Sequence, residues 1–470
     1  MYLLLMPEII IALLGILVVI LTLILPNKGQ EAAKFVTTAG IIGVLVWIFS
    51  NFNREASLFN NIYLIDPYAS FFKMLFLTAS LLVILSSFKY VKKFGRRTSE
   101  FYAFLLFTIL GMMIMVSAGD LLTLYIALEL MTISFYILVA YVLNRETSQE
   151  AAIKYLILGA LSSGILLFGI SMIYALSGTT VISEIALCLR EEPALISAVV
   201  LLLAGFGFKI ALVPFHMWTP DIYEGAPINV TSFLAVASKA AGLAAMVRFF
   251  MISLDLFWFD WHLLLAILAA ATMIIGNLIA LVQTNIKRLL AYSSIAQAGY
   301  LAVGLVAAND YGLKGVLFYS MVYVFANLGA FAVATQIEND MESNEIEAFG
   351  QLGKRSPFLA AVMTVCLLSL AGIPPLAGFA GKFYLFSGAV EGGYVWLAFI
   401  GLLMSMISVY YYLKVVKVMY IGKAEKNAPL AIEFPARIAL WICVLLTLLF
   451  GIYPVPLTVL TRNAVSLFLG

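Results

Sequence analysis

Long, nearly uninterrupted runs of apolar residues recur along the whole chain, and they restrict its fold more than any other feature. Of the 470 residues, 64% are hydrophobic and only 11% are charged, whereas soluble domains carry roughly a quarter charged residues. A helix needs about 20 apolar residues to cross a bilayer, and most of the runs reach that length. The sequence therefore predicts an all-α polytopic membrane protein.

About fourteen apolar segments are expected to cross the membrane. The fourth and fifth segments nearly merge at Gly119-Asp120, where Asp120 is expected to cap the second of the two helices. The twelfth segment is too long for one straight helix. The predicted segments lie near residues 3–25, 32–52, 68–91, 101–117, 119–143, 151–176, 194–218, 228–252, 258–283, 289–308, 312–336, 357–390, 393–420 and 434–463.

Lysine and arginine are concentrated in alternate connections between these segments. The connections after even-numbered segments carry little beyond Arg54 and Arg190. By the positive-inside rule, the connections after odd-numbered segments are cytoplasmic and both termini lie outside, on the periplasmic side. The basic residues after odd-numbered segments are Lys28, Lys34, Lys92, Lys93, Arg96, Arg97, Arg145, Lys287, Arg288, Lys354, Arg355, Lys423 and Lys426.

Four ionisable residues lie deep within apolar segments: Glu129, Lys209, Lys239 and Lys382. Glu129 is about ten residues into its segment, which places it roughly 15 Å deep at 1.5 Å per residue. A charge at the bilayer centre costs roughly 2.5–3.5 kcal/mol on insertion scales, so such residues usually mark a functional site. A single one could belong to a structural ion pair, but four at one depth indicate ion transport.

Proline interrupts two of the apolar segments. Pro214 follows Lys209 in the seventh segment, and Pro374-Pro375 precede Lys382 in the twelfth. Such breaks free backbone carbonyls that only protein or trapped water can satisfy. The two broken segments are five apart, and a shift of five reverses membrane direction, so a five-helix repeat must be inverted. Broken helices at matched positions of inverted repeats predict a transport site.

Lysine and glutamate suit proton transfer through a membrane. Burial disfavours the charged form of a lysine and a nearby carboxylate favours it, so a few kcal/mol can switch a buried lysine between holding and releasing a proton. We therefore predict a transfer path from Glu129 through Lys209 and Lys239 to Lys382, with uptake from the cytoplasm and release near Lys382. Tyrosines, serines and water are expected between these groups.

Several other polar residues are accessory candidates. Tyr125 shares a helical face with Glu129, and Tyr323 lies on a polar face of the eleventh segment. His216, near the end of the broken seventh segment, is interpreted as a capping or interface residue, with proton uptake as the alternative. Lys154 is expected to extend its ammonium to the membrane surface, again with uptake as the alternative.

No motif in the sequence predicts a bound metal or redox cofactor. The cysteines Cys188, Cys366 and Cys443 are far apart, and the chain has only two histidines. Neither an iron–sulfur site nor a disulfide framework is therefore supported. Glycine fingerprints for nucleotides are also absent. The cysteines are interpreted as small apolar side chains in the core.

Four stretches of the chain resemble the antiporter-like subunits of respiratory complex I. Within that family the resemblance is to the N subunits of bacterial NADH–quinone oxidoreductases, the counterparts of mitochondrial subunit 2, and it covers essentially the whole chain. In the related M subunits the position of Lys382 typically holds glutamate, and the L subunits carry a long C-terminal extension. The stretches are Val213–Pro227, Phe233–Gly242, Lys287–Tyr300 and Leu370–Phe379.

The resemblance implies fourteen helices with two inverted five-helix repeats, each containing a half-channel. It divides the chain into three N-terminal helices (1–100), a first repeat (101–252), a second repeat (253–420) and a C-terminal helix (421–470). It also implies that Glu129 and Lys209 form a pair, that Lys239 is the central lysine and that Lys382 belongs to the second half. Gln297 departs from the family, where histidine is frequent. An amide cannot relay a proton, so Gln297 is left out of the predicted path.

The resemblance further implies a subunit of an enzyme complex located in the bacterial inner membrane. NADH-to-quinone electron transfer would occur on other subunits, which would hold FMN, iron–sulfur clusters, NADH and quinone, and this chain would pump protons. Its partners would be lipids and membrane subunits M, J and K, with no nucleic acid. Two alternatives remain: an antiporter-like subunit of an Mrp-type sodium/proton antiporter or membrane-bound hydrogenase, and a structural spacer with its charges paired.

Overall fold

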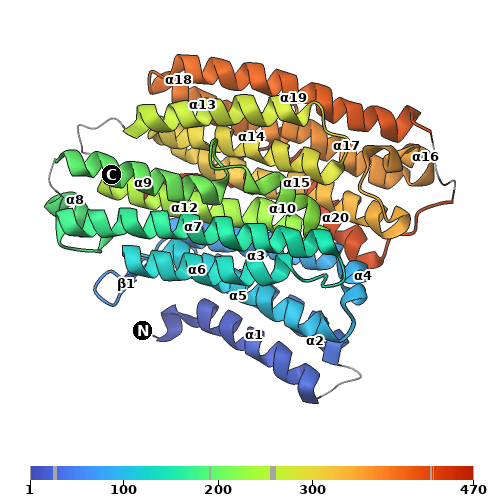
Figure 1. Cartoon of the computed structure of the whole chain (residues 1–470), viewed down its shortest axis with the longest axis horizontal. Coiled ribbons are helices and arrows are strands. Elements are labelled where there is room, and N and C mark those ends of the chain that lie inside the picture. The colour runs from blue at the N-terminus through green and yellow to red at the C-terminus, as the bar shows by residue number, and fades with distance from the viewer. Residues whose placement is uncertain are drawn as a thin grey trace.

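Parallel and antiparallel helices make up almost the entire chain (Figure 1). The computed structural model describes residues 2–24, 29–189, 192–254, 261–423, 426 and 428–468. Lys28 and Arg190, which contributed to the predicted orientation, lie outside the described residues. Within these ranges thirteen helices are long and apolar enough to cross a membrane. The prediction of an all-α polytopic membrane protein is thereby confirmed.

The bundle is built mainly from helices of 15 to 32 residues. In Figure 1, α1 lies along one edge and α19 along the opposite edge. The bounds are α1 (Met6–Ile24), α2 (Gly29–Ser50), α3 (Pro67–Ser86), α5 (Thr98–Ser117), α6 (Leu121–Val139), α7 (Glu146–Ser177), α9 (Pro193–Ile210), α12 (Lys239–Ser253), α13 (Trp261–Ala280), α14 (Ile286–Ala307), α15 (Asp310–Met341), α17 (Pro357–Ala371), α18 (Ala377–Glu391), α19 (Val395–Ile421) and α20 (Phe434–Ile452).

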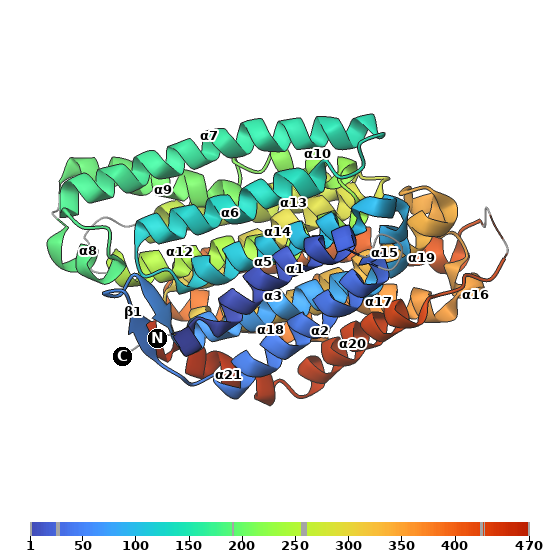
Figure 2. The same ribbon diagram turned by 90° about the horizontal axis from the view of Figure 1, so that it is seen from below.

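Short elements connect or extend these helices. Figure 2 shows the small β1–β2 hairpin at the same end of the bundle as α8, and α21 following α20. The short elements are α4 (Phe88–Val91), α8 (Ile182–Cys188), α10 (Trp218–Gly225), α11 (Ile228–Phe233), α16 (Leu352–Arg355), α21 (Val455–Val465), the antiparallel strands β1 (Ala56–Leu58) and β2 (Tyr63–Ile65), the π-helical turn Leu234–Ser238, and the 3₁₀ turns Tyr2–Leu4, Lys92–Arg97, Ile346–Phe349 and Ser466–Phe468.

The predicted discontinuous helices are confirmed, and the two breaks have the same backbone geometry. α9 ends before Ala211 and α17 ends before Gly372, and both residues are left-handed, with φ of 62° and 85°. In each break the next N–H bonds back across the turn: Leu212 donates to the Gly207 carbonyl at 2.7 Å, and Ile373 to the Leu368 carbonyl at 3.1 Å. The proline of each break follows, and α10 and α18 then resume the helical direction.

The fourteenth predicted segment, 434–463, is two helices rather than one. α20 ends at Ile452 and α21 begins at Val455, with Pro454 between them. A proline ring clashes with the preceding helical turn and lacks the N–H that would continue it. The prediction of one continuous helix is therefore wrong: the chain turns at Pro454, and only α20 is long enough to cross the membrane.

The centre of the bundle is formed by the helices that lie in the middle of the sequence. The continuous segment Ile228–Ser253, which contains α11, the π-helical turn and α12, is buried at almost every position, and so is the part of α15 at residues 315–338. α14 is almost as completely buried. These helices carry Lys239 and Tyr323, so the structure places both residues in the interior.

Substituting Gly378 is expected to destabilise the second broken helix. Its backbone N–H donates to the Ser369 hydroxyl at 3.1 Å, which ties α18 to α17. A methyl group at this position would collide with the Ser369 carbonyl oxygen. Gly378→Ala should therefore lower the free energy of unfolding by about 1–3 kcal/mol, measured as a lower midpoint of thermal unfolding.

Gly43→Ala is the matched control for this prediction. Nothing lies within 4 Å of the methyl group that this change would add to α2. Alanine is about 0.5–1 kcal/mol better than glycine inside a helix, so the control should not lower the midpoint. Equal losses in the two variants would contradict the prediction.

Candidate functional site

Lys209 lies in the last turn of α9, directly before the first helix break. Its side chain is buried, with 2% of the residue exposed. The ammonium donates to the Thr132 hydroxyl of α6 at 2.8 Å. Thr132 in turn donates to the Leu128 carbonyl at 2.6 Å, so its hydroxyl is oriented to accept from the lysine.

Glu129 lies one turn before Thr132 on α6. It is half-buried, and its Oε1 atom has no hydrogen-bond partner. Its carboxylate is close enough to interact electrostatically with Lys209, Tyr125 and Tyr136, which are called its electrostatic neighbours below. No carboxylate, including that of Glu129, lies within 4 Å of the Lys209 ammonium among the described residues. The structure thus brings the expected pair into one cluster, with Lys209 bonded to Thr132 rather than to Glu129.

Lys239 begins α12 immediately after the π-helical turn, and its side chain points to α14. Its ammonium donates to the Ser294 hydroxyl at 2.7 Å and lies 5.8 Å from the centre of the Tyr223 ring. Ser294 also donates to the Ala291 carbonyl at 2.8 Å, and Tyr323 on α15 accepts from the Asn327 amide at 2.7 Å. Single π-helical turns are frequent at functional sites.

A glycine lets α12 pack closely against the end of α9 that carries Lys209. A methyl group on Gly242 would lie 3.2 Å from the Lys209 Cβ atom and 3.1 Å from Ile210. Glycine therefore allows α12 to pass against the end of α9 at this point. The sequence signal for this contact was the small-residue stretch around Lys239.

A hydrogen-bonded cluster on α14, α15 and α19 lies between Lys239 and Lys382. Ser293, next to Ser294, shares a hydrogen bond of 2.5 Å with Tyr412. The Gln297 amide donates to Tyr412 at 3.5 Å and to the Leu370 carbonyl at 3.0 Å. Tyr319 donates to the Gln297 carbonyl oxygen. Gln297, which sequence reasoning left out of the path, therefore lies at the centre of this cluster.

Lys382 lies in α18 and turns back toward the second helix break. Its ammonium donates to the carbonyls of Leu370 and Ala371 at 2.9 and 3.2 Å, and to the Ser405 hydroxyl at 2.9 Å. The two carbonyls end α17, where the helix dipole is negative, so the cation is stabilised there. The Tyr300 ring centre lies 4.4 Å away, close enough for a cation–π contact.

His216 is buried close to the central lysine. It is 7% exposed, and its Nδ1 atom has no hydrogen-bond partner. Lys239 is an electrostatic neighbour. His216 is therefore enclosed by the protein, beside the central lysine.

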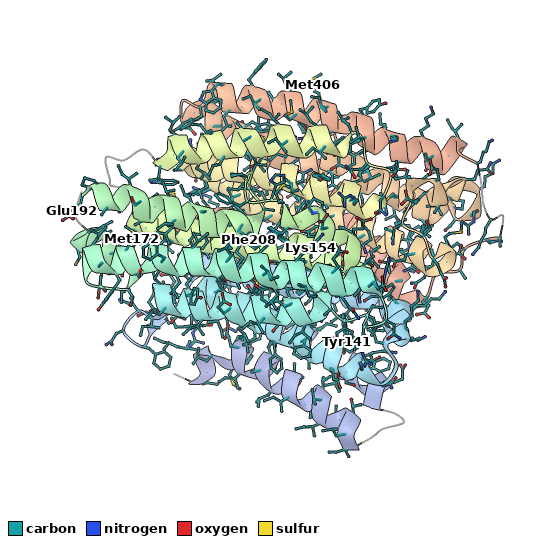
Figure 3. The ribbon with its side chains drawn as sticks, in the orientation of Figure 1. Tyr141, Lys154, Met172, Glu192, Phe208 and Met406 are labelled. Carbon is teal, nitrogen blue, oxygen red and sulfur yellow. The ribbon has the colours of Figure 1, made fainter. Side chains whose placement is uncertain are left out.

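Lys154, which is labelled in Figure 3, belongs to a half-exposed cluster of charges. Its ammonium is 2.7 Å from Glu150 and 2.8 Å from Asp221, and Asp221 is also 3.3 Å from Arg288. Partial burial would raise the pKa of Asp221, but the hydrogen bonds from Lys154 and Arg288 outweigh that effect and lower it. The cluster ties α7, α10 and α14 together at one end.

Two buried ion pairs near the start of α3 were missed by sequence reasoning. Lys73 lies 2.8 Å from Glu8 and donates to the Tyr63 hydroxyl at 3.1 Å. Arg248, which is 0% exposed, donates to both oxygens of Asp66 at 2.9 and 2.8 Å. The only sequence signal was a charged residue inside an apolar run, without any indication of its partner.

Comparisons with known proteins agree with this architecture. Residues 118–408 match the family described as NADH:quinone oxidoreductase/Mrp antiporter, TM. NADH-quinone oxidoreductase subunit N from Heliobacterium modesticaldum is 50% identical over 468 residues, which cover 99% of each chain. A chain of respiratory complex I from Thermus thermophilus with bound aureothin is 33% identical with a TM-score of 0.84, covering 97% of this chain and 99% of that one. A chain of the Mrp complex from Dietzia shares the fold at 19% identity, with a TM-score of 0.86 and coverage of 100% and 98%.

Proposed function

The chain belongs to the NADH:quinone oxidoreductase/Mrp antiporter transmembrane family, and on this premise we propose that it is the proton-translocating membrane subunit of an NADH–quinone oxidoreductase. Electron transfer from NADH to quinone on other subunits drives proton movement through this one. The observation that carries the proposal is the series of three buried lysines, each hydrogen-bonded to a hydroxyl group on another helix. A proton-transport path needs buried groups that gain and lose a proton, and a hydroxyl group can hydrogen-bond to such a group in either protonation state.

The first half of the path depends on the charge of Glu129. A negative Glu129 favours the protonated state of its electrostatic neighbour Lys209. Neutralising or withdrawing that carboxylate leaves Lys209 with only the neutral Thr132 hydroxyl, so its proton is released toward Lys239. A helix shift or a protonation event is enough, because a few kcal/mol moves the equilibrium by several pKa units.

The second half of the path connects Lys239 to Lys382. Ser294 accepts from Lys239, and Ser293 shares a hydrogen bond with Tyr412. Because hydroxyl groups both donate and accept hydrogen bonds, these groups can pass a proton toward Lys382 together with water between them. Gln297 does not carry the proton; it holds Tyr412 and Tyr319 in position. Release occurs on the Lys382 side, next to the second helix break.

In this proposal the chain carries no redox chemistry of its own. FMN, the iron–sulfur clusters, NADH and quinone bind to other subunits of the complex. The neighbouring subunits are the antiporter-like M and the smaller J and K, in a bacterial plasma membrane with both termini on the outer side. Proton uptake is from the cytoplasmic side.

An assembly experiment distinguishes this function from that of a sodium/proton antiporter subunit. The tagged chain, purified from membranes, should bring down flavin and iron–sulfur subunits with NADH-dependent quinone reduction. The assembly reconstituted in vesicles should acidify them without added sodium. The antiporter function is favoured instead if the partners lack redox centres or if proton movement requires sodium.

Thr132→Val tests the contact between α6 and Lys209. Valine has nearly the same volume but leaves the buried ammonium without its hydrogen-bond acceptor, which costs about 1–3 kcal/mol. The rate of NADH-driven proton pumping in vesicles should fall roughly thirtyfold at the middle of that range.

Thr108→Val is the matched control. Thr108 is also buried and also donates to a carbonyl four residues earlier in its own helix, at 2.7 Å, but no lysine among the residues that the structure describes donates to its hydroxyl. Pumping in this variant should stay near the wild-type rate. Equal effects of the two substitutions would assign a purely structural role to Thr132.

A further inference from the structure

Two cavities adjoin at the end of the molecule where α5 begins and α6 ends. The first has a volume of about 550 Å³ and is mostly polar, and the second, of about 640 Å³, is an apolar groove between α5, α6 and α7. Arg97, Tyr141 and Leu143 line both cavities, so the two are separated by a common wall. Tyr141 is labelled at this end of α6 in Figure 3.

The polar cavity contains cations without anionic partners. Lys93 and Arg97 line it, and neither has a carboxylate within 4 Å among the described residues. The Lys93 ammonium lies 5.0 Å from the centre of the Tyr90 ring. The third cation, Arg145, is 3.7 Å from the buried Glu338. Glu342 is the second carboxylate of the lining, so the three cations exceed the two anions by one charge.

The groove has an apolar wall that is open to the surroundings of the bundle. Its side chains are large hydrophobic groups, several of them strongly exposed, such as Ile133 and Ile153 at 52% and 58%. Arg97 and Glu100 are its charged residues, and both belong to the end next to the polar cavity. The principal apolar residues are Phe104, Ile133, Ile137, Ile153 and Leu156.

The partition between the two cavities is held by several contacts. The Tyr141 hydroxyl donates to the Arg97 carbonyl at 2.5 Å. Its ring packs edge-on against Phe94 and Phe101, with ring centres 4.9 and 5.4 Å apart. The start of α5 and the end of α6 are therefore tied together, so the site is preformed.

We propose that the two cavities together bind one anionic phospholipid of the surrounding bilayer. Its phosphate contacts Lys93 and Arg97, and one acyl chain lies in the groove. Basic pockets between helices on the cytoplasmic side are suited to anionic head groups, and this end carries most of the basic connections in the sequence. A soluble anion would not use the groove, and a soluble apolar ligand would not use the cations.

The bound lipid would also cover the Glu129 cluster on this face. Tyr136 lines the groove and is an electrostatic neighbour of Glu129. An acyl chain against Tyr136 excludes water from that side. The site therefore lies next to the proton path without contributing a proton-carrying group to it.

Photolabelling of the intact assembly tests the proposal. The probe is phosphatidylglycerol with a diazirine on one acyl chain, compared with the matching phosphatidylcholine, and labelled peptides are identified by mass spectrometry. Peptides of α6 and α7 that line the groove should be labelled several-fold more by the anionic probe. Equal labelling by the two probes would overturn the assignment of an anionic head group.

Two variants and a control separate the head-group site from the groove. Lys93→Gln with Arg97→Gln should reduce labelling by the anionic probe roughly tenfold, because each basic residue near the surface favours anionic lipid. Ile137→Trp should reduce it by filling the groove. Lys89→Gln with Lys354→Gln removes two exposed charges from residues that do not line the cavities, and it should leave labelling unchanged.

The proposal is overturned if the anionic probe does not label the groove in the wild-type assembly. A neighbouring subunit that covers the groove would give this result. Labelling that is unchanged in both the charge and the groove variants overturns it as well. Measuring the labelled fraction only on assemblies that retain full NADH-dependent quinone reduction separates loss of the lipid from loss of folding.

Discussion

Lys209→Ala is expected to reduce NADH-driven proton pumping roughly 100-fold, the usual contribution of a proton-transferring side chain being 10²–10⁴. The alanine removes the one ionisable group that contacts Thr132 and has Glu129 as its electrostatic neighbour. No other basic side chain is within hydrogen-bonding distance of the Thr132 hydroxyl in the described part of the chain. The measurement is the initial rate of acidification in vesicles that contain the purified assembly.

Two further variants make this prediction specific. Lys417→Ala removes a lysine from another long helix, α19, where the side chain is exposed, and pumping should remain near the wild-type rate. Lys209→Arg keeps the positive charge but holds its proton too tightly to release it, so it should not restore pumping. A wild-type rate in Lys209→Ala, with the assembly intact, would leave the chain as a structural spacer.

Arg248→Met is expected to cause the largest loss of stability of any single change in the bundle that we consider. The guanidinium is 0% exposed and binds both oxygens of Asp66, which also caps α3 by accepting from Ala69 N–H at 2.7 Å. Removing one partner of a buried pair leaves the other charge uncompensated, which costs about 3–5 kcal/mol. Thermal unfolding of the purified assembly should therefore begin at a clearly lower temperature.

The control for this stability prediction is an exposed ion pair. Lys92 and Glu433 are 3.2 Å apart, and 57% and 35% of their side chains are exposed. Lys92→Met should cost about 0–1 kcal/mol, since water screens such pairs. Adding Asp66→Asn to Arg248→Met should recover part of the loss, because the amide removes the uncompensated charge and can still cap α3. No recovery, or equal losses in the two single variants, would show that the buried charge is not the cause.

Much of the fold could be predicted because the membrane restricts the choices so strongly. The broken helices were predictable from Pro214 and Pro374-Pro375, since a proline in the interior of a helix removes a backbone hydrogen bond and kinks or breaks the helix. The end of α20 at Ile452 was missed although Pro454 gives the same signal, because the surrounding run remains apolar. Hydropathy alone does not distinguish a turn buried among helices from a span.

The contacts within the site were less predictable than its residues. Glu129, Thr132 and Lys209 were all recognisable, but which of the two α6 residues receives the ammonium depends on how α9 rotates against α6. Gln297 was left out of the predicted proton path because an amide does not ionise. Its side chain nevertheless holds two tyrosines in place, donating to Tyr412 and accepting from Tyr319. Arg248 and Asp66 are separated by 182 positions, and no local pattern connects residues so far apart.

The Leu370 carbonyl is shared by two side chains, Lys382 at 2.9 Å and Gln297 at 3.0 Å. One oxygen atom thus anchors an ammonium from the second broken helix and an amide from the central α14. When the lysine gives up its proton, its pull on this oxygen weakens and the amide becomes the stronger partner. The Leu370 peptide unit then couples two helices: the charge of Lys382 on α18 affects how firmly Gln297 holds α14 to the break.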